Sequence, residues 1–384
     1  MAEAFKNLLN PGLVELAARH LGAAGRGFKP RRFLEQALPG LEGLEMKARA
    51  MRIADALEAA LPADFEAAAE AIESALAPPH PGEDVGQIAC GEAGLAGWIV
   101  WPLGEFVARR GLDQPERALD CLHALTQRFS AEFALRPFLV RHPERSFERL
   151  YAWCGDASFH VRRLCSEGSR PRLPWGLRLT ALVRDPSPTE PILRALLDDP
   201  SAYVRRSVAN HLNDIAKDHP ERVVAWVEEH LPGAGPERRR LLEHAGRTLI
   251  KAGHPRLLAA FGSGAALAGA ARLTLAAQRL RIGGELALEV ALTSTARRPQ
   301  NLVIDLRLLL RKANGSLAPK VFKGWKLALA PGAAQTLRKS LSFRPVTTRR
   351  LYPGPQALEI VINGQTAARA EFELLAAEAK GRSR

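Results

Sequence analysis

An unusual group of polar residues lies between Asp199 and Pro220. If this stretch is helical, two amides and a short carboxylate gather on the side opposite its apolar residues, at about 100° per residue. Asn and Asp are poor helix formers that compete with the backbone for hydrogen bonds, so an ordinary solvated face would carry Lys and Glu. These side chains can bind a polar ligand, and they can equally form a polar seam between stacked helices. The set comprises Arg206, Asn210, Asn213 and Lys217, with Tyr203 and Asp214 along its edge.

The same stretch has the features of a capped amphipathic helix. Asp199 or Ser201 can accept hydrogen bonds from the first amides, and Pro220 is expected to end the helix after Lys217 and Asp218. Four apolar residues form a single stripe, which predicts packing on one side only. They are Val204, Val208, Leu212 and Ile215.

Two blocks of sequence recur at one spacing. Residues 139–143 match 182–186, and residues 156–163 match 199–206, both at an offset of 43 residues. A period of roughly 40 to 47 residues with two helices per unit is typical of HEAT or armadillo repeats. We therefore predict that residues 1–262 form an α-solenoid of irregular HEAT-like repeats.

Equivalent positions of successive repeats are expected to line up along one concave surface. Glu167 and Asn210 are one period apart, and so are Glu132 and Trp175. Together with Asp214, these residues are predicted to share one strip of the surface.

Doubled arginines occur at equivalent positions near the starts of successive second helices. They are Arg162 with Arg163 and Arg205 with Arg206. An arginine at this place in a HEAT unit commonly binds the neighbouring repeat, so one of each pair is expected to be structural.

The region before the repeats is also expected to be helical. Asn10 followed by Pro11 fits an N-cap with proline at the first helical position. Residues 78–82 are rich in proline and predict a loop, and Trp98 and Trp101 are expected in the core. Further helical segments are predicted at 33–38, 44–61 and 65–76.

After residue 262 a Gly/Ala-rich linker leads into short segments of alternating polarity. Pairs such as Asn314-Gly315 and Asn363-Gly364 separate these segments as turns. Residues 271–377 are therefore predicted to form an immunoglobulin-like β-sandwich. The predicted strands include 286–292, 302–306, 326–329, 358–362 and 370–374.

The formal net charge of +13 is concentrated in one part of the chain. From residue 271 onward there are 20 Lys or Arg against 7 Asp or Glu, whereas the first 270 residues hold 34 of each. This asymmetry predicts a partner with many negative charges, most simply a nucleic acid backbone. An anionic membrane surface fits less well, because no basic amphipathic helix accompanies the charge.

The chain has no apolar run near the roughly 20 residues of a membrane span and no visible signal peptide. The cysteines show neither a CxxC pair nor zinc-ligand spacing, so reduced core thiols and no metal are expected. These features predict a cytoplasmic protein. The cysteines are Cys90, Cys121, Cys154 and Cys165.

At several of these motifs the chain resembles the AlkC-type DNA glycosylases. They are the branch of the HEAT-like-repeat alkylpurine DNA glycosylases with a C-terminal immunoglobulin-like domain, and the resemblance spans nearly the whole chain. It is carried by residues 101–106, 127–133, 166–175, 205–220 and 312–323.

The resemblance implies a monofunctional glycosylase of base excision repair that removes N3-alkylated bases such as 3-methyladenine and 3-methylcytosine. It implies hydrolysis of the N-glycosidic bond without full extrusion of the lesion, in contrast to base-flipping enzymes. Asp214 and Glu132 are the implied catalytic residues, and Glu167, Trp175 and Asn210 line the lesion site. A cationic base leaves easily, and a carboxylate can stabilise the oxocarbenium character of the sugar and orient the water.

The implied partner is double-stranded DNA containing alkylated bases, bound by a DNA-associated monomer without cofactor, metal, membrane or obligate protein partner. The residues expected to contact DNA are Arg163, Arg170, Arg172, Arg206, Lys217, Lys312, Lys320 and Lys323.

Structural alternatives exist for individual residues. Glu132 could pair with Arg136, Glu167 could bond Arg163 at i−4, and Trp175 could be a buried turn anchor. Asp214 has no obvious partner on its own helix beyond Lys217 and its neighbours. For the whole chain, the alternative is a non-catalytic HEAT scaffold that binds protein partners and nucleic acid.

Overall fold

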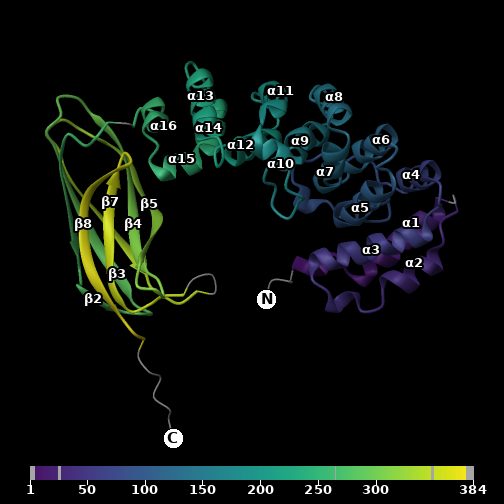
Figure 1. The fold of residues 1–384 in the computed structure, drawn as a ribbon, viewed down its shortest axis with the longest axis horizontal. Coiled ribbons are helices and arrows are strands. Elements are labelled where there is room, and N and C mark those ends of the chain that lie inside the picture. The colour runs from purple at the N-terminus through teal and green to yellow at the C-terminus, as the bar shows by residue number, and fades with distance from the viewer. Residues whose placement is uncertain (1–4, 25–26, 264, 347–349, 378–384) are drawn as a thin grey trace, which may run out of the picture. The chain divides into compact units, whose positions relative to one another are not determined.

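The computed structural model describes residues 5–24, 27–263, 265–346 and 350–377. The chain falls into two compact units (Figure 1). One contains the chain up to His219 together with Ala234–Ala245, and the other contains Pro220–Gly233 and the chain from Gly246 onward. The domain limits proposed from the sequence, 1–262 and 271–377, follow the change from helices to strands and remain a prediction of domain extent.

The first unit is helical, which confirms the predicted class for this part of the chain. Among the described residues, no helix is long and apolar enough to cross a membrane. Its α-helices are α1 (Pro11–Ala23), α2 (Pro30–Ala37), α3 (Met46–Ala60), α4 (Phe65–Ser74), α5 (Val100–Arg110), α6 (Pro115–Thr126), α7 (Glu132–Arg141), α8 (Pro143–Trp153), α9 (Phe159–Gly168), α10 (Thr180–Arg184), α11 (Glu190–Ala195), α12 (Ala202–Ile215) and α14 (Pro236–Ala245). Short 3₁₀ helices are η1 (Phe5–Leu8), η2 (Leu41–Gly43), η3 (Val85–Gln87), η4 (Gly97–Ile99) and η5 (Ser187–Thr189).

Two predicted helix starts are confirmed by their caps. The Asn10 side chain accepts a 2.9 Å hydrogen bond from the Leu13 amide, and Ser201 Oγ accepts one of 3.2 Å from the Val204 amide. The predicted end of α12 was wrong. The helix ends at Ile215, and Pro220 instead provides the first residue of α13, a position that needs no amide donor.

The apolar stripe of α12 is buried as predicted, and the helix packs between α9 and α14. The polar side is only partly solvated, however. Arg206 and Lys217 are exposed, whereas Asn213 and Asp214 are 2% and 1% exposed. The polar seam therefore accounts for part of the set, including Asn210, whose Oδ1 bonds His244 Nε2 of α14 at 3.0 Å.

The aromatic and loop predictions before the repeats are mostly confirmed. Trp101 is buried, whereas Trp98 is half-buried and so only partly in the core. Residues 78–82 contain neither helix nor strand, as expected for the proline-rich segment.

The repeat is visible in the contacts of its arginines. Arg162 Nη1 donates to the carbonyls six and five residues before it, and Arg205 Nη1 does the same one repeat later. Each also pairs with an acid beyond its own helix, Asp199 at 2.6 Å and Glu237 at 2.9 Å. This confirms that one arginine of each doubled pair is structural.

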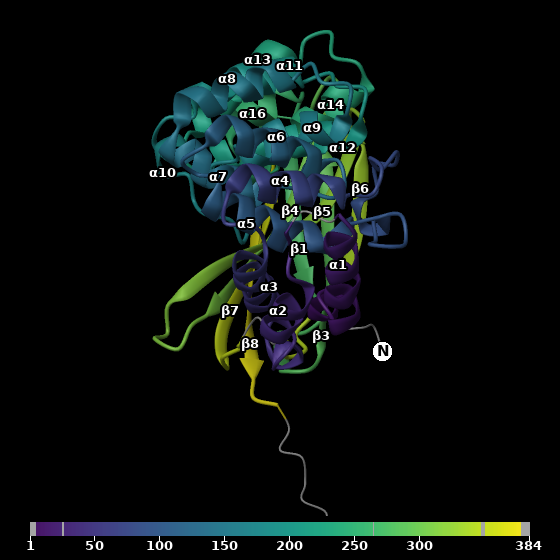
Figure 2. The same ribbon diagram turned by 90° about the vertical axis from the view of Figure 1, so that its right-hand side faces the viewer.

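The second unit combines three helices with a β-sandwich (Figures 1 and 2). A three-stranded sheet has the order β1-β3-β6, and a five-stranded sheet has the order β2-β8-β7-β4-β5. The elements are α13 (Pro220–His230), α15 (Arg247–Ala252), α16 (Pro255–Ala260), β1 (Gly269–Leu275), β2 (Arg279–Arg281), β3 (Glu285–Ser294), β4 (Gln300–Arg311), β5 (Leu317–Leu329), β6 (Ala334–Ser342), β7 (Gly354–Ile362) and β8 (Gln365–Leu375).

The core of the sandwich comes from alternate residues of both sheets. In β3 and β4 every second side chain is buried, as the alternating sequence predicts. Val290 of the first sheet and Leu306 and Ile360 of the second belong to one core cluster. The rings of Phe343 and Phe372 meet edge to face at 5.6 Å within it. The immunoglobulin-like sandwich predicted from the sequence is confirmed.

The two structural arginines give a matched stability test. We expect Arg162→Ala to cost about 3 kcal/mol of unfolding free energy, because it leaves the buried Asp199 carboxylate without its ion pair. Arg205→Ala should cost less, since its partner Glu237 is 56% exposed. Urea denaturation followed by circular dichroism measures both. Equal losses would contradict this account of the repeat.

Candidate functional site

Three carboxylates from three helices converge in the first unit. Glu132 is the first residue of α7, Glu167 lies in the last turn of α9, and Asp214 lies in the last turn of α12. Arg163 stands between the first two, 3.3 Å from Glu132 and 3.6 Å from Glu167. Arg170 links Glu167 to Asp214, lying 2.6 Å from the first carboxylate and 2.8 Å from the second. We call these five residues with Lys217 the carboxylate chain.

Local spacing on α9 positions the middle of the carboxylate chain. Arg163 and Glu167 are four residues apart on one helix face, and Arg170 follows in the turn after the helix. The adjacent face of α12 supplies Ser207, whose hydroxyl donates to Glu167 Oε2 at 2.6 Å. The i−4 pair considered for Glu167 is therefore present, but it is one of three contacts to this carboxylate.

Asp214 has more partners than its helix alone suggested. Arg170 Nε donates to Asp214 Oδ2 at 2.8 Å, and Lys217 Nζ donates to Oδ1 at 2.8 Å. The partner missed by the sequence comes from the turn after α9. Among the three cations of the carboxylate chain, Lys217 is the most exposed, with 43% of its side chain accessible.

The formal charges of the carboxylate chain balance. Arg163, Arg170 and Lys217 match the three carboxylates in formal charge, so the carboxylate chain itself is neutral. The buried Arg136 guanidinium adds one positive charge beside it. Exposure differs along the chain: the side chains of Glu132, Glu167 and Asp214 are 14%, 8% and 2% accessible. Glu132 is thus the carboxylate most open to a ligand.

Burial and ion pairing push two of the acids in opposite directions. Desolvation raises the pKa of Glu132, and the attraction of Arg163 only partly opposes it. Desolvation also acts to raise the pKa of Glu167, but Arg163 and Arg170 outweigh it and the net pKa is lowered. Such divergence is common where acids with different tasks share one site.

Several neighbours of the carboxylate chain were not predicted as site residues. The Arg163 guanidinium lies 4.9 Å from the Tyr203 ring centroid and donates to Ser130 Oγ. Burial raises the pKa of Tyr203 to about 12, so its hydroxyl stays neutral. The four-residue spacing of Tyr203 and Ser207 on the polar edge of α12 was the available signal.

Arg136 does not pair with Glu132, so that alternative was wrong. It is fully buried and donates instead to main-chain carbonyls of Gly168 and Leu177. Beside it, burial lowers the pKa of His211 to about 3, which keeps this imidazole neutral.

Trp175 is 63% exposed, so the interpretation as a buried turn anchor was wrong. Its ring stacks near that of Trp101 with centroids 6.3 Å apart and planes 12° apart, and it lies 5.8 Å from Phe5. Its φ of 64° is in the left-handed region, which is costly for a bulky residue. An exposed aromatic ring in a strained conformation fits a ligand contact better than a role in the core.

The other cations predicted to contact DNA have different environments. Arg163 and Arg170 point into the carboxylate chain, where 14% and 9% of their side chains are accessible, and their contact with DNA stays a prediction. Arg172 forms two 2.6 Å bonds with Asp218, whereas Arg206 is exposed.

On the sandwich, the three predicted lysines lie along the β4–β5 hairpin. Lys312, Lys320 and Lys323 are all exposed. Lys320 Nζ lies 5.3 Å from the Phe322 ring centroid, and Lys339 of β6 donates to the carbonyl of Lys323. β5 is an edge strand, and its lysines protect that edge from pairing with another chain.

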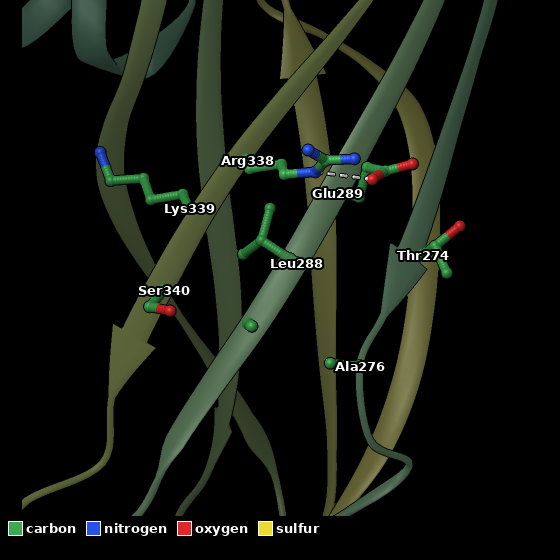
Figure 3. Close-up of a pocket in the computed structure, with 8 residues that line it drawn as sticks. Thr274, Ala276, Leu288, Glu289, Arg338, Lys339 and Ser340 are labelled. Carbon is green, nitrogen blue, oxygen red and sulfur yellow. Dashed lines mark hydrogen bonds and ion pairs between the residues drawn. The ribbon is translucent and has the colours of Figure 1, made fainter.

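Neither a metal site nor a second catalytic cluster emerges in the described part of the chain. No group of three His, Cys, Asp or Glu there could hold a metal ion. The four cysteines are free thiols, two buried and two half-buried, so only two are core residues. A depression of about 520 Å³ on the β1-β3-β6 sheet contains Arg338 bonded to Glu289 at 2.9 Å (Figure 3). Thr274, Lys339 and Ser340 also line this depression, but Glu289 is the one carboxylate among its lining residues.

Comparison with known proteins places this arrangement in a family. Residues 128–241 match the family model described as DNA alkylation repair enzyme, and residues 269–376 match that of the YhaZ C-terminal Ig-like domain. Protein YhaZ of Bacillus subtilis (strain 168), described as uncharacterized, is 34% identical over 371 residues, 96% of this chain and 99% of that protein.

A solved structure agrees over the same length. The Pseudomonas fluorescens alkylpurine DNA glycosylase AlkC, bound to DNA containing an abasic site analog, is 36% identical with a TM-score of 0.85. The match covers 97% of this chain and 100% of that one. The chain therefore belongs to the AlkC/YhaZ family of DNA alkylation repair proteins.

Proposed function

We propose that this protein is a DNA glycosylase that hydrolyses the N-glycosidic bond of cationic N3-alkylated bases in double-stranded DNA, 3-methyladenine and 3-methylcytosine among them. The convergence of Glu132, Glu167 and Asp214 carries this proposal, because three acids linked in one cluster suit a positively charged base. The family model for DNA alkylation repair and the likeness to the AlkC glycosylase support it.

The charge of the lesion explains why carboxylates suffice. An N3-alkylated base is already a good leaving group and needs little acid catalysis, whereas the sugar it leaves acquires oxocarbenium character. A carboxylate close to the sugar stabilises this charge and can orient the attacking water. Because the acids also attract the cationic base, they favour it over a neutral one. Water is the nucleophile, so the proposed reaction needs no cofactor and leaves an abasic site.

Within the carboxylate chain, we assign the direct contact with the sugar or water to Glu132. It is the most accessible of the three acids, and its ion pair with Arg163, at 3.3 Å, is longer than the pairs of 2.6 and 2.8 Å that Arg170 forms with the other two acids. Asp214 is the second proposed catalytic acid. Its Oδ1 becomes available when Lys217 turns from the carboxylate to a DNA phosphate, which the exposed position of Lys217 permits.

The lesion is proposed to rest against the helical surface without full extrusion into a pocket. Trp175 offers its ring face to the lesion nucleotide, with a cation–π contribution of about 0.5–2 kcal/mol. Glu167 orders the two arginines beneath it, and Asn210 borders the same side of α12. DNA phosphates are proposed to bind Arg172, Arg206 and Lys217 on the helical unit. On the sandwich they are proposed to bind the three lysines of the β4–β5 hairpin, Lys312, Lys320 and Lys323.

The first prediction concerns base release. Asp214→Asn and Glu132→Gln should each lower single-turnover excision of 3-methyladenine from methylated duplex DNA by about 10²-fold or more, since each removes transition-state charge stabilisation. Chromatography of released bases, in buffer containing a chelator, measures the rate. Binding to DNA with an abasic-site analogue should persist in both variants.

Asp214→Asn also removes a buried ion pair, so Glu132→Gln is the cleaner variant and circular dichroism must show that both fold. Full activity in both would eliminate the mechanism. If the unmodified protein released no base at any salt concentration, a DNA-binding scaffold would be the better account.

A second prediction follows from the raised pKa of Glu132. Because burial disfavours its ionised form in the folded protein, Glu132→Gln should raise the melting temperature at pH 7 while lowering activity. The gain should be absent below the ordinary pKa of glutamate, grow as pH rises to the raised value, and then stay constant. Calorimetry across pH 4–8 tests the sign, and a lower melting temperature at pH 7 would show that Glu132 is well compensated.

The third prediction concerns the sandwich. Lys312, Lys320 and Lys323 are replaced together by Ala. The slope of the logarithm of the DNA-binding constant against the logarithm of salt concentration should then become shallower by about 0.9 for each phosphate contact that is lost. Fluorescence anisotropy at several salt concentrations gives the slope.

A triple variant that removes the same charge from other exposed positions of this unit is the control. Arg297, Arg298 and Arg344 are suitable. Equal slopes for the two triple variants would mean that the sandwich acts through its net charge rather than through the lysines of the β4–β5 hairpin.

A further inference from the structure

The most completely buried cation near the site takes no part in the carboxylate chain. Arg136 is 0% exposed, and its Nη1 donates to the Gly168 carbonyl at 2.7 Å. Its Nε donates to the Leu177 carbonyl. Gly168 is the last residue of α9, and Leu177 lies two residues beyond Trp175. One guanidinium therefore ties together both ends of the segment that contains Arg170 and Trp175.

The outer part of this segment has little side-chain anchoring of its own. Leu173 and Leu179 are buried at its two ends. Between them, Trp175 and Leu177 are 63% and 54% exposed, so neither is held by burial. Three bonds to main-chain carbonyls fix this part. Arg136 bonds the Leu177 carbonyl, the Gly176 amide donates to the Leu173 carbonyl at 3.3 Å, and the Leu179 amide donates to the Pro171 carbonyl at 3.3 Å.

Trp175 occupies this segment in a conformation that needs support. Its φ of 64° is left-handed, which costs a residue with a Cβ free energy that only the surroundings can offset. Gly176 packs directly on the guanidinium, because a Cβ there would lie 3.2 Å from Arg136 Cδ and Nε. The loop is thus shaped against Arg136, and the strained residue next to Gly176 is the one that presents its ring to solvent.

We propose that Arg136 is a positioning residue for the lesion site, which holds Trp175 in its exposed, left-handed conformation through the carbonyls of Gly168 and Leu177. The proposal rests on the glycosylase function above. Arg136 touches neither substrate nor carboxylate here; it acts through the backbone of the segment. Loss of its bonds lets Trp175 relax to an ordinary conformation, and the ring then leaves the place where the lesion nucleotide binds.

The first experiment separates the strain from the ring. Trp175→Gly and Trp175→Ala both remove the aromatic ring, but only glycine adopts a φ of 64° without cost. The glycine variant should therefore melt at a higher temperature than the alanine variant, although both bind and excise poorly. Equal melting temperatures would mean that no strain is held at this position.

The second experiment is a double-mutant cycle with Arg136→Lys, which keeps the charge but loses the forked geometry. Arg136→Lys should reduce single-turnover excision by about tenfold in the unmodified protein, the scale expected when a positioned group is displaced. It should cause no further reduction in Trp175→Gly. Independent, multiplying effects of the two substitutions on excision would overturn the proposal, because Arg136 would then not act through Trp175.

A readout that needs no excision completes the test. Acrylamide quenching of tryptophan fluorescence should change with Arg136→Lys when Trp175 is present and should not change in a Trp175→Phe background. If the protein excised nothing, the proposed function would fail while this quenching result still decided the role of Arg136. An unchanged quenching profile in both backgrounds would overturn the role itself.

Arg128→Lys is a matched control for general loss of stability. Arg128 also bridges a loop and a helix, donating from Nε to the Ala77 carbonyl at 2.6 Å and from Nη1 to the Ala124 carbonyl at 2.9 Å. It bonds no residue of the carboxylate chain. The loss of excision caused by Arg136→Lys should depend on the presence of Trp175. The loss caused by Arg128→Lys should be the same with and without Trp175. The same dependence for both would reduce Arg136 to a structural residue.

Discussion

The arrangement depends on burying three carboxylates without leaving any of them unpaired. Removing an ionised group from water is costly unless opposite charge and hydrogen bonds replace the water. In the carboxylate chain each acid contacts at least one arginine, and Arg163 and Arg170 each serve two acids. This sharing fixes how α7, α9 and α12 can stack, because each guanidinium sets the separation of two helices.

The helical repeat is what allows such a chain to form. Because α9 and α12 are equivalent helices of successive repeats, their polar edges run alongside each other. Successive residues of one edge therefore contact successive residues of the other: Arg163 with Tyr203, Glu167 with Ser207, and Arg170 with Asp214. The first arginine of each doubled pair bonds within the repeat scaffold, and of the two second arginines Arg163 joins the carboxylate chain whereas Arg206 is exposed. The period therefore supplies both the scaffold and the alignment of the functional side chains.

Sequence patterns predicted what depends on period and polarity. The solenoid, the caps at Asn10 and Ser201, the sandwich and the structural role of one arginine per pair all follow from local spacing. The pairing of Asp214 with Arg170 did not, because Arg170 reaches it from the turn after α9, and local spacing does not show which way a side chain in a turn points. The left-handed backbone of Trp175 was not predicted either, because the carbonyls that Arg136 bonds around this residue carry no sequence signal.

A neutral site suits a cationic ligand better than a strongly acidic one would. Three uncompensated carboxylates would repel the DNA phosphates before any lesion arrived, whereas a balanced chain presents little net charge at a distance. Lys217 is the one cation of the carboxylate chain with substantial exposure, so a DNA phosphate can compete with Asp214 for its ammonium group. In the proposed mechanism, the carboxylate chain gains a negative charge only when DNA is bound and the positively charged base lies beside it. Selectivity for a cationic base can thus arise from the timing of charge exposure as well as from shape.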